Sequence, residues 1–222
     1  MSFYLSAMGN EMDRPYPPSQ LFDIDAATFG AFVPAPEVET WMQETFIDDA
    51  SPLYNEDHAH LAQARIGVLW TNAVNVTKMV PVAGMVELPK PHPALGKWGK
   101  ARHEWQMQQW FGDLELDFLI TLYAPYALNE AGDIEWCALI EHELYHCAQS
   151  LDEFGSPAFN KRTGRPKFTI KGHDVEENIG IVRRYGATGR NVKEFVAAAN
   201  RKPEIGFADV SRACGTCRLR VA

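Results

Sequence analysis

The sequence predicts an α+β fold, in which a small mixed or antiparallel sheet packs on one central helix and is followed by a hairpin and further helices. Three observations predict this class. The 222 residues are 46% hydrophobic, which suits one globular domain with a substantial core. An apolar run over 117–123 is typical of a buried strand, and the segment 134–149 has helical periodicity. Strand-like segments come largely before helical ones, whereas α/β folds alternate them.

The first half of the chain is predicted to combine helices with strands. A proline-rich start, RPYPP, favours a flexible segment over 1–20. Apolar residues on one side of 37–46 indicate a helix, and the segments 61–70 and 80–88 each contain an apolar run typical of a strand. The segment 97–111 is predicted to be a helix that buries its three tryptophans, Trp98, Trp105 and Trp110.

The second half is predicted to be mainly helical. The strand over 117–123, with the sequence DFLITLY, is followed by a helix over 134–149. Turn residues in the middle of 159–170 favour a hairpin. Further helices are expected over 174–185 and 192–200, where apolar residues recur with helical spacing.

We expect a single domain over 21–200, with an irregular tail over 201–222. The net charge of −8 excludes a protein that is basic overall and binds nucleic acid through its general charge. Four cysteines are too few for a disulfide framework in a chain of this length. We find neither a signal-peptide pattern nor a membrane-spanning apolar run, so we expect a cytoplasmic protein with no membrane partner. Nothing in the sequence predicts the oligomeric state.

The segment predicted as the central helix contains the pattern H-E-x-x-H, formed by His142, Glu143 and His146. Residues four apart lie one turn apart on the same helical face, so the two imidazoles can bind one Zn²⁺ ion. Glu143 follows the first histidine and would lie beside the metal, where it can act as a general base and then as a general acid. The opposite face of the helix is apolar and is predicted to pack on a core: Cys137, Ile140, Leu144 and Cys147.

A catalytic zinc site needs a third protein ligand and leaves its fourth position to water. His173 is the predicted third ligand, because the segment 172–177 (GHDVEE) starts the next predicted helix and gathers potential ligands. Glu176 and Glu177 are alternative third ligands, and together with Asp174 they are candidates for orienting a ligating histidine through a hydrogen bond. A solvated acidic helix start is the remaining interpretation.

The surroundings of the predicted helix suggest how a substrate would be held. A strand beside the metal-binding helix of a zinc peptidase lines the cleft and pairs with extended substrate, so we expect this of 117–123. The sequence does not choose among four candidates for stabilising a tetrahedral oxyanion: Tyr145, Arg183, Arg184 and Tyr185.

Two further groups of potential ligands leave alternatives open. His58 and His60 would face the same side of a strand and could bind a second metal, but we favour polar residues that hydrogen-bond a neighbouring loop. Cys214 and Cys217 form a C-x-x-C pattern. We favour free or reversibly oxidised thiols over a metal knuckle completed by unusual ligands or a second chain, and over a redox pair.

Basic residues are concentrated in the predicted hairpin, where 155–172 contains five cations and no acidic residue: Lys161, Arg162, Arg165, Lys167 and Lys171. The hairpin lies between the second and third predicted ligands, hence near the cleft. Its cations over 161–171 could attract an acidic substrate or the phosphates of a nucleic acid. A solvated charged hairpin is the interpretation that we favour.

Several segments taken together carry the pattern of a known family: 51–61, 65–70, 117–121, 137–147 (CALIEHELYHC), 152–155 (DEFG) and 172–177 (GHDVEE). On these residues, the span 51–186 resembles the phage metallopeptidase family. Two positions depart from the family pattern, since Leu116 stands in place of a proline and Asn178 in place of an aromatic residue. Both departures affect packing and not the metal site.

The resemblance implies a zincin-type, zinc-dependent peptidase that is encoded by a phage or prophage, works in the bacterial cytoplasm and hydrolyses a protein or peptide substrate. The chain is also similar, more loosely, to SprT-like zinc proteases, which pair a helical H-E-x-x-H with a later histidine. Two alternatives remain open. One is a non-catalytic, zinc-bearing interaction module, and the other is a DNA-associated, SprT-like protease.

Overall fold

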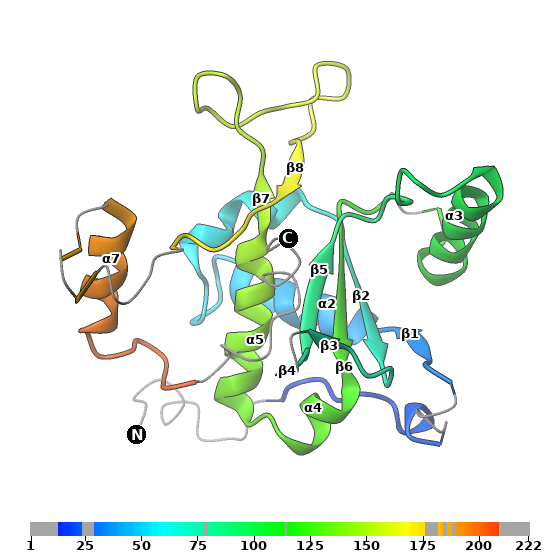
Figure 1. Ribbon diagram of the computed structural model, residues 1–222, viewed down its shortest axis with the longest axis horizontal. Coiled ribbons are helices and arrows are strands. Elements are labelled where there is room, and N and C mark those ends of the chain that lie inside the picture. Colours follow the sequence, from blue (N-terminus) through cyan, green and yellow to red (C-terminus); the bar gives the residue numbers. More distant parts are fainter. Residues whose placement is uncertain are drawn as a thin grey trace.

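A computed structural model describes residues 13–23, 29–77, 80–113, 115–175, 182–183, 186–187 and 190–208. A four-stranded sheet forms its centre (Figure 1), built from β1 (Phe32–Pro34), β2 (Ile66–Thr71), β5 (Gly84–Glu87) and β6 (Phe118–Tyr123). The strand order is β1-β2-β6-β5. The central pair β2 and β6 is parallel, and both outer pairs are antiparallel. The predicted α+β class with a mixed sheet is therefore confirmed.

Helices cover both faces of this sheet: α2 (Pro36–Met42) and α5 (Asp133–His146) on one face and α3 (Lys97–Phe111) on the other. Successive side chains of a strand point to opposite faces, so Val68, Trp70 and Ile120 enter the main core with α2 and α5. Their neighbours in the two strands, Leu69 and Leu119, point to the other face and enter the smaller cluster under α3. This alternation places α5 and α3 on opposite sides of the sheet (Figure 1).

Shorter elements complete the described chain: η1 (Ser19–Leu21), η2 (Gln43–Ile47), η3 (Glu56–Gln63), β3 (Val76–Thr77), β4 (Val80–Pro81), α4 (Ala124–Asn129), β7 (Cys147–Gln149), β8 (Phe168–Ile170) and α7 (Arg190–Ala199). The predicted helices over 134–149 and 192–200 correspond to α5 and α7. The predicted helix over 174–185 lies mostly outside the described residues. Within the described ranges, we find no helix with the length and apolar character needed to cross a bilayer.

The hairpin expected over 159–170 forms differently from the prediction. Its turn lies where expected, because the Gly164 amide donates to the Asn160 carbonyl and Phe159 pairs with Pro166. The following strand, β8, pairs instead with β7, which directly follows α5. The hairpin therefore extends a two-stranded ladder that leaves the body at the end of α5 (Figure 1).

The expectation that α3 buries its tryptophans is wrong for two of the three. Trp98 is 91% exposed and Trp105 is 58% exposed. Trp110 is half-buried, and with Met107 and Phe111 it packs on the cluster of β2 and β6 side chains. The physical reason is that, among the described residues, the packing of α3 on the sheet comes from Met107, Trp110 and Phe111 in its second half, so the two tryptophans that precede them meet no core there.

The expectation that 117–123 pairs with substrate is also wrong. This segment is β6, which has a hydrogen-bonded neighbour on each side, β2 and β5. Its backbone groups are already used in the sheet, so it cannot accept another strand. The strand at the edge of the sheet nearest α5 is β5.

Candidate metal centre

Helix α5 holds the H-E-x-x-H pattern in its last two turns. His142 and Glu143 are adjacent, and His146 lies one turn later. Its start is anchored by Asp133, whose carboxylate pairs with the buried guanidinium of Arg14 at 3.0 Å. The predicted apolar face is confirmed, because one side of the helix is buried in the core: Trp136, Cys137, Leu139, Ile140 and Leu144. The pattern therefore lies on a helix that the core holds in place.

The third histidine reaches the site through the ladder that follows α5. β7 begins at Cys147, immediately after His146, and Cys147 pairs with Ile170 of β8. The Lys171 amide then donates to the carbonyl of His146 at 2.9 Å. This antiparallel return brings His173 back to the helix that the chain left 27 residues earlier.

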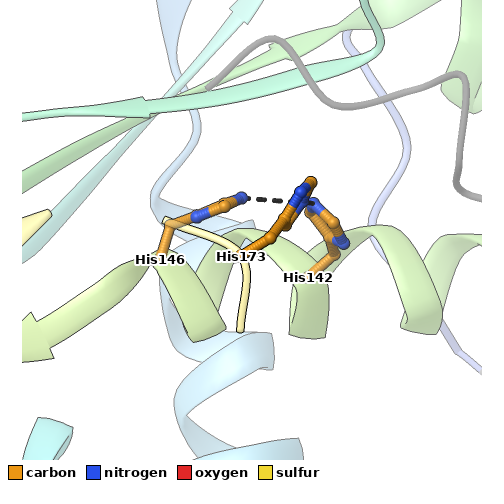
Figure 2. A group of neighbouring side chains, drawn as sticks. All are labelled: His142, His146 and His173. Atoms are coloured by element: carbon orange, nitrogen blue, oxygen red, sulfur yellow. Dashed lines mark hydrogen bonds between the residues drawn. The ribbon is translucent and has the colours of Figure 1, made fainter. Parts of the chain in front are cut away.

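The side chains of His142, His146 and His173 converge on one point (Figure 2). The Nε2 atom of His142 lies 3.2 Å from that of His146 and 3.5 Å from that of His173. One nitrogen from each ring lies within 4.8 Å of the others. Two nitrogens bound tetrahedrally to one ion at 2.0–2.1 Å are about 3.3 Å apart. The separations of His142 from His146 and from His173 therefore match two edges of a tetrahedral metal site, and the three nitrogens are close enough to share one ion.

A backbone hydrogen bond orients His146. Its Nδ1 lies 2.7 Å from the carbonyl oxygen of Lys171, and a carbonyl oxygen only accepts, so Nδ1 carries the proton. In the neutral ring this leaves the lone pair on Nε2, the atom that faces the other two histidines. Such an outer hydrogen bond fixes both the tautomer and the angle of a metal-binding imidazole.

Glu143 is fully buried between α5 and the edge strand β5. Gly84 of β5 leaves the room for it, because a Cβ atom at this position would lie 3.1 Å from Oε1 of Glu143 and 3.0 Å from Cδ1 of Leu139. The Glu143 carboxyl group is therefore enclosed on the sheet side of α5 and away from bulk water.

The family model described as "Putative phage metallopeptidase" matches residues 39–200. The chain belongs to this family. The match covers the whole described histidine cluster and most of the sheet. No curated protein and no solved structure matches the chain.

Membership of a phage metallopeptidase family implies a hydrolase that uses a metal ion and acts on a protein or peptide. The histidine cluster is a group that could hold such an ion. Family and geometry therefore point to the same place in the molecule.

The acidic residues predicted near His173 divide into two groups. Asp174 is exposed, and its carboxylate pairs with the ammonium of Lys171 at 2.6 Å. Glu176 and Glu177 lie outside the described residues. Of the candidates that the structure describes, it is His173 that joins His142 and His146.

The pair His58 and His60 lies on the 3-10 helix η3 and not on a strand, so the two rings do not share a face. His60 hydrogen-bonds the carbonyls of Asp57 at 3.0 Å and Cys147 at 2.8 Å. The favoured interpretation is thus confirmed for His60, which ties η3 to the end of α5. His58 is fully buried, and burial lowers its pKa to about 4.

The cysteines that the structure describes are buried thiols. Burial raises the pKa of Cys137 to about 12 and raises that of Cys147 well above its usual range. Both are therefore protonated at neutral pH and act as small apolar side chains. Cys214 and Cys217 lie outside the described residues.

Two of the five hairpin cations are engaged in ion pairs within the protein. Arg165 lies 2.6 Å from Asp117 at the start of β6, and Lys171 pairs with Asp174 as described above. The exposed cations Lys161, Arg162 and Lys167 remain on the projecting part of the hairpin. The structure thus narrows the predicted basic patch to three side chains.

Among the oxyanion candidates, Tyr145 has another role. Its hydroxyl donates to the carboxylate of Asp57 at 2.9 Å, and its ring packs on that of His58. Arg183 is exposed. Arg184 and Tyr185 lie outside the described residues.

Three contributors to the site have no motif that sequence reasoning could have found. The carbonyl of Lys171 is a backbone group, so its partner depends on the fold alone. His60 supports the end of α5 from a segment far away in the sequence. Gly84 carries a weak signal, since an isolated glycine in a strand pattern often marks a close approach.

Proposed function

We propose that the chain is a zinc-dependent peptidase of zincin-like fold, with its metal bound by His142, His146 and His173. The observation that carries the proposal is the convergence of three imidazole nitrogens within 4.8 Å of one another in a chain of a metallopeptidase family. Nitrogen ligands in this number and geometry suit zinc, which prefers four-coordinate sites. Within the described residues the group contains three ligands, which leaves a corner for water or substrate.

In this proposal the three histidines bind the metal, and Glu143 transfers protons. Bound zinc would supply Lewis-acid polarisation of a carbonyl group and a nucleophilic water at neutral pH. The Glu143 carboxylate would accept a proton from this water and pass it to the leaving nitrogen. Its enclosed position favours this role, because burial against β5 holds the carboxyl group in one place.

The edge strand β5 is the proposed site for the substrate backbone. It lies at the open edge of the sheet and contacts α5, which carries the histidines. An extended peptide can add to such an edge through main-chain hydrogen bonds. Because β5 runs beside Glu143, this placement would bring a scissile bond to the proposed proton acceptor.

Metal analysis combined with a proteolysis assay tests the proposal. The purified full-length chain should contain one zinc per molecule and should hydrolyse unfolded protein substrates, with loss of hydrolysis on chelation and recovery on addition of zinc. A chain that binds no metal in spite of an intact fold would overturn the proposed site. A chain that binds zinc but cleaves none of the substrates in a proteome-derived peptide library would favour the interaction module instead.

The coordination number separates the enzyme from a non-catalytic zinc-bearing module. X-ray absorption at the zinc edge should show three nitrogen ligands and one oxygen from water for a peptidase. A fourth nitrogen or sulfur ligand from the protein would indicate a closed, structural site.

A further inference from the structure

A cavity of about 840 Å³ lies on the side of α5 next to the metal-binding face. Its walls are the segment 52–57, one face of α5 and the C-terminal segment 203–206. Glu141 and Tyr145 line it, and each directly precedes a histidine of the candidate metal centre. Consecutive helical residues are rotated by about 100° around the axis, so the cavity and the histidines occupy neighbouring faces of the same two turns.

The polar lining of the cavity is negatively charged. Four carboxylates line it: Glu56, Asp57, Glu141 and Glu204. No lysine or arginine is among the described residues that form its walls. The remaining walls are largely apolar, with Pro52, Leu53 and Ile205 among them. Such a lining suits a ligand with a positive end and an aliphatic stem.

A hydrogen-bond network holds the carboxylates in place without neutralising them. The Asn55 amide donates to Glu141 at 2.9 Å and contacts the Tyr145 hydroxyl at 3.0 Å. Tyr145 in turn donates to Asp57 at 2.9 Å. These partners are uncharged, so the network orients two acidic side chains and supplies no counter-charge to either, while burial raises the pKa of Glu141.

A buried polar ring, that of His58, lies behind the wall of the cavity and is a second observation beside the carboxylates. The ring is fully buried, and neither nitrogen has a hydrogen-bond partner among the described residues. Its Nε2 atom is directed at the cavity-lining carboxylate of Glu141 from 3.7 Å, which is too long for a hydrogen bond. Among the described residues no lysine or arginine forms an ion pair with Glu141, so this carboxylate has no cationic partner there.

We propose that this cavity binds the positively charged side chain of a lysine or arginine in the polypeptide substrate. The proposal rests on the proposed peptidase function and names the class of substrate. A divalent cation fits less well, because within the described residues it is the three histidines, and no set of cavity carboxylates, that converge closely enough to hold an ion. A guanidinium or ammonium group needs no such convergence and uses the apolar walls as well.

The distance between the two sites predicts where the basic residue stands. A helix with its side chains is about 10 Å wide, and an extended peptide advances about 3.3 Å per residue. A substrate that leaves the edge of β5 and crosses α5 at the histidines would therefore place its basic side chain about two to four residues from the cut.

Binding of a small probe tests the cavity independently of catalysis. Nα-acetyl-arginine amide is titrated into the full-length, isotope-labelled chain, and Nα-acetyl-citrulline amide serves as its neutral, nearly isosteric control. We expect saturable chemical-shift changes at Ala138, Glu141 and Ile205 with the arginine probe, and at least about tenfold weaker binding of citrulline. Absence of saturable arginine binding, or equal binding of the two probes, overturns the proposal.

Substitution of exposed lining residues checks the location. The double variant Glu56→Gln/Glu204→Gln removes two surface carboxylates without touching the core, and it should weaken the arginine probe about tenfold. Glu153→Gln, which changes an exposed acid in the loop after β7, is the matched control and should change nothing. If both variants bind the probe like the unmodified chain, the site lies elsewhere and the proposal fails.

Cleavage profiling separates this inference from the proposed function. We expect cuts in a proteome-derived peptide library to be enriched for lysine and arginine at one fixed position, and the Glu56→Gln/Glu204→Gln variant to lose that enrichment. Cleavage without basic preference, together with no probe binding, would refute the cavity and leave the peptidase intact. Probe binding without any cleavage would refute the peptidase and leave the cation site standing.

Discussion

The candidate centre depends on single atoms whose positions are set by their neighbours. The lone pair of His146 faces the cluster because a carbonyl oxygen holds the proton of the opposite nitrogen. The carboxyl group of Glu143 is enclosed because Gly84 has no side chain.

Glu143→Gln should separate metal binding from catalysis. The amide is nearly isosteric and cannot accept a proton, so we expect unchanged zinc content and hydrolysis lowered by about 10²–10⁴-fold. Metal analysis and peptide-cleavage rates on the same sample check both parts. Glu153→Gln serves as the control, and a Glu143→Gln enzyme with full activity would rule out the proposed proton transfer.

His173→Ala should weaken zinc binding with little effect on the fold, because His173 is exposed. Loss of an outer hydrogen bond to a metal site weakens binding about 10–100-fold, and loss of a ligand should exceed this. Competition with a chromogenic chelator measures the affinity. His92→Ala, another exposed histidine, should leave the affinity unchanged. Equal zinc affinity of the two variants would mean that another residue is the third ligand.

Gly84→Ala should reduce activity more than it reduces metal binding. The added methyl group would crowd Oε1 of Glu143 and Cδ1 of Leu139, at 3.1 and 3.0 Å. We expect about tenfold slower cleavage from the displaced carboxylate, with zinc content retained. Gly96→Ala is the matched control, since a Cβ atom there has no neighbour within 4 Å. A pH–rate profile identical to that of the unmodified chain, at unchanged rate, would contradict this positioning role.

At the scale of elements, the pairing of β7 with β8 brings the third histidine, His173, to the two histidines of α5. Sequence periodicity located α5 and β6 well, because each is a long segment with a strong pattern. It missed the pairing of β7 with β8, since strands of three residues carry little pattern of their own. It also assigned the tryptophans of α3 to the core, although helical spacing alone does not show which part of a helix has a partner.

Arg165→Ala should loosen the hairpin from the body. Arg165 lies 2.6 Å from Asp117, and both side chains are partly exposed, so we expect a loss of stability of up to about 1 kcal/mol. Hydrogen exchange should become faster over 158–167. Arg162→Ala removes an equal charge at the exposed tip and should leave exchange unchanged. Slow exchange in both variants would mean that backbone pairing alone holds the hairpin.

At the scale of the whole molecule, metal binding should stabilise the fold, because the ligands come from two segments that only the folded chain brings together. Free zinc at about 100 times its dissociation constant should raise the free energy of unfolding by about 2.7 kcal/mol. Thermal denaturation with and without zinc measures this. The His142→Ala variant should lose the stabilisation, and a zinc-induced shift of equal size in that variant would place the metal elsewhere.

The sequence by itself determined the family of this protein and two of its three candidate metal ligands. The spacing of His142 and His146 on one helix, with Glu143 between them, depends on local helical geometry, which is readable without a fold. The same holds for the family, whose pattern is carried by short segments. For the third ligand, the sequence left His173 beside two alternatives, Glu176 and Glu177, because no local pattern relates any of them to α5.

Tertiary structure decided which groups meet. It joined His173 to α5 through the strand pairing of Cys147 with Ile170, and it made β5 rather than β6 the edge strand. It also formed the acidic cavity, whose walls come from three segments far apart in the chain. The physical reason is the same in each case. Contacts between distant segments depend on how strands pair and layers pack, and a local pattern of residues carries no record of its distant partner.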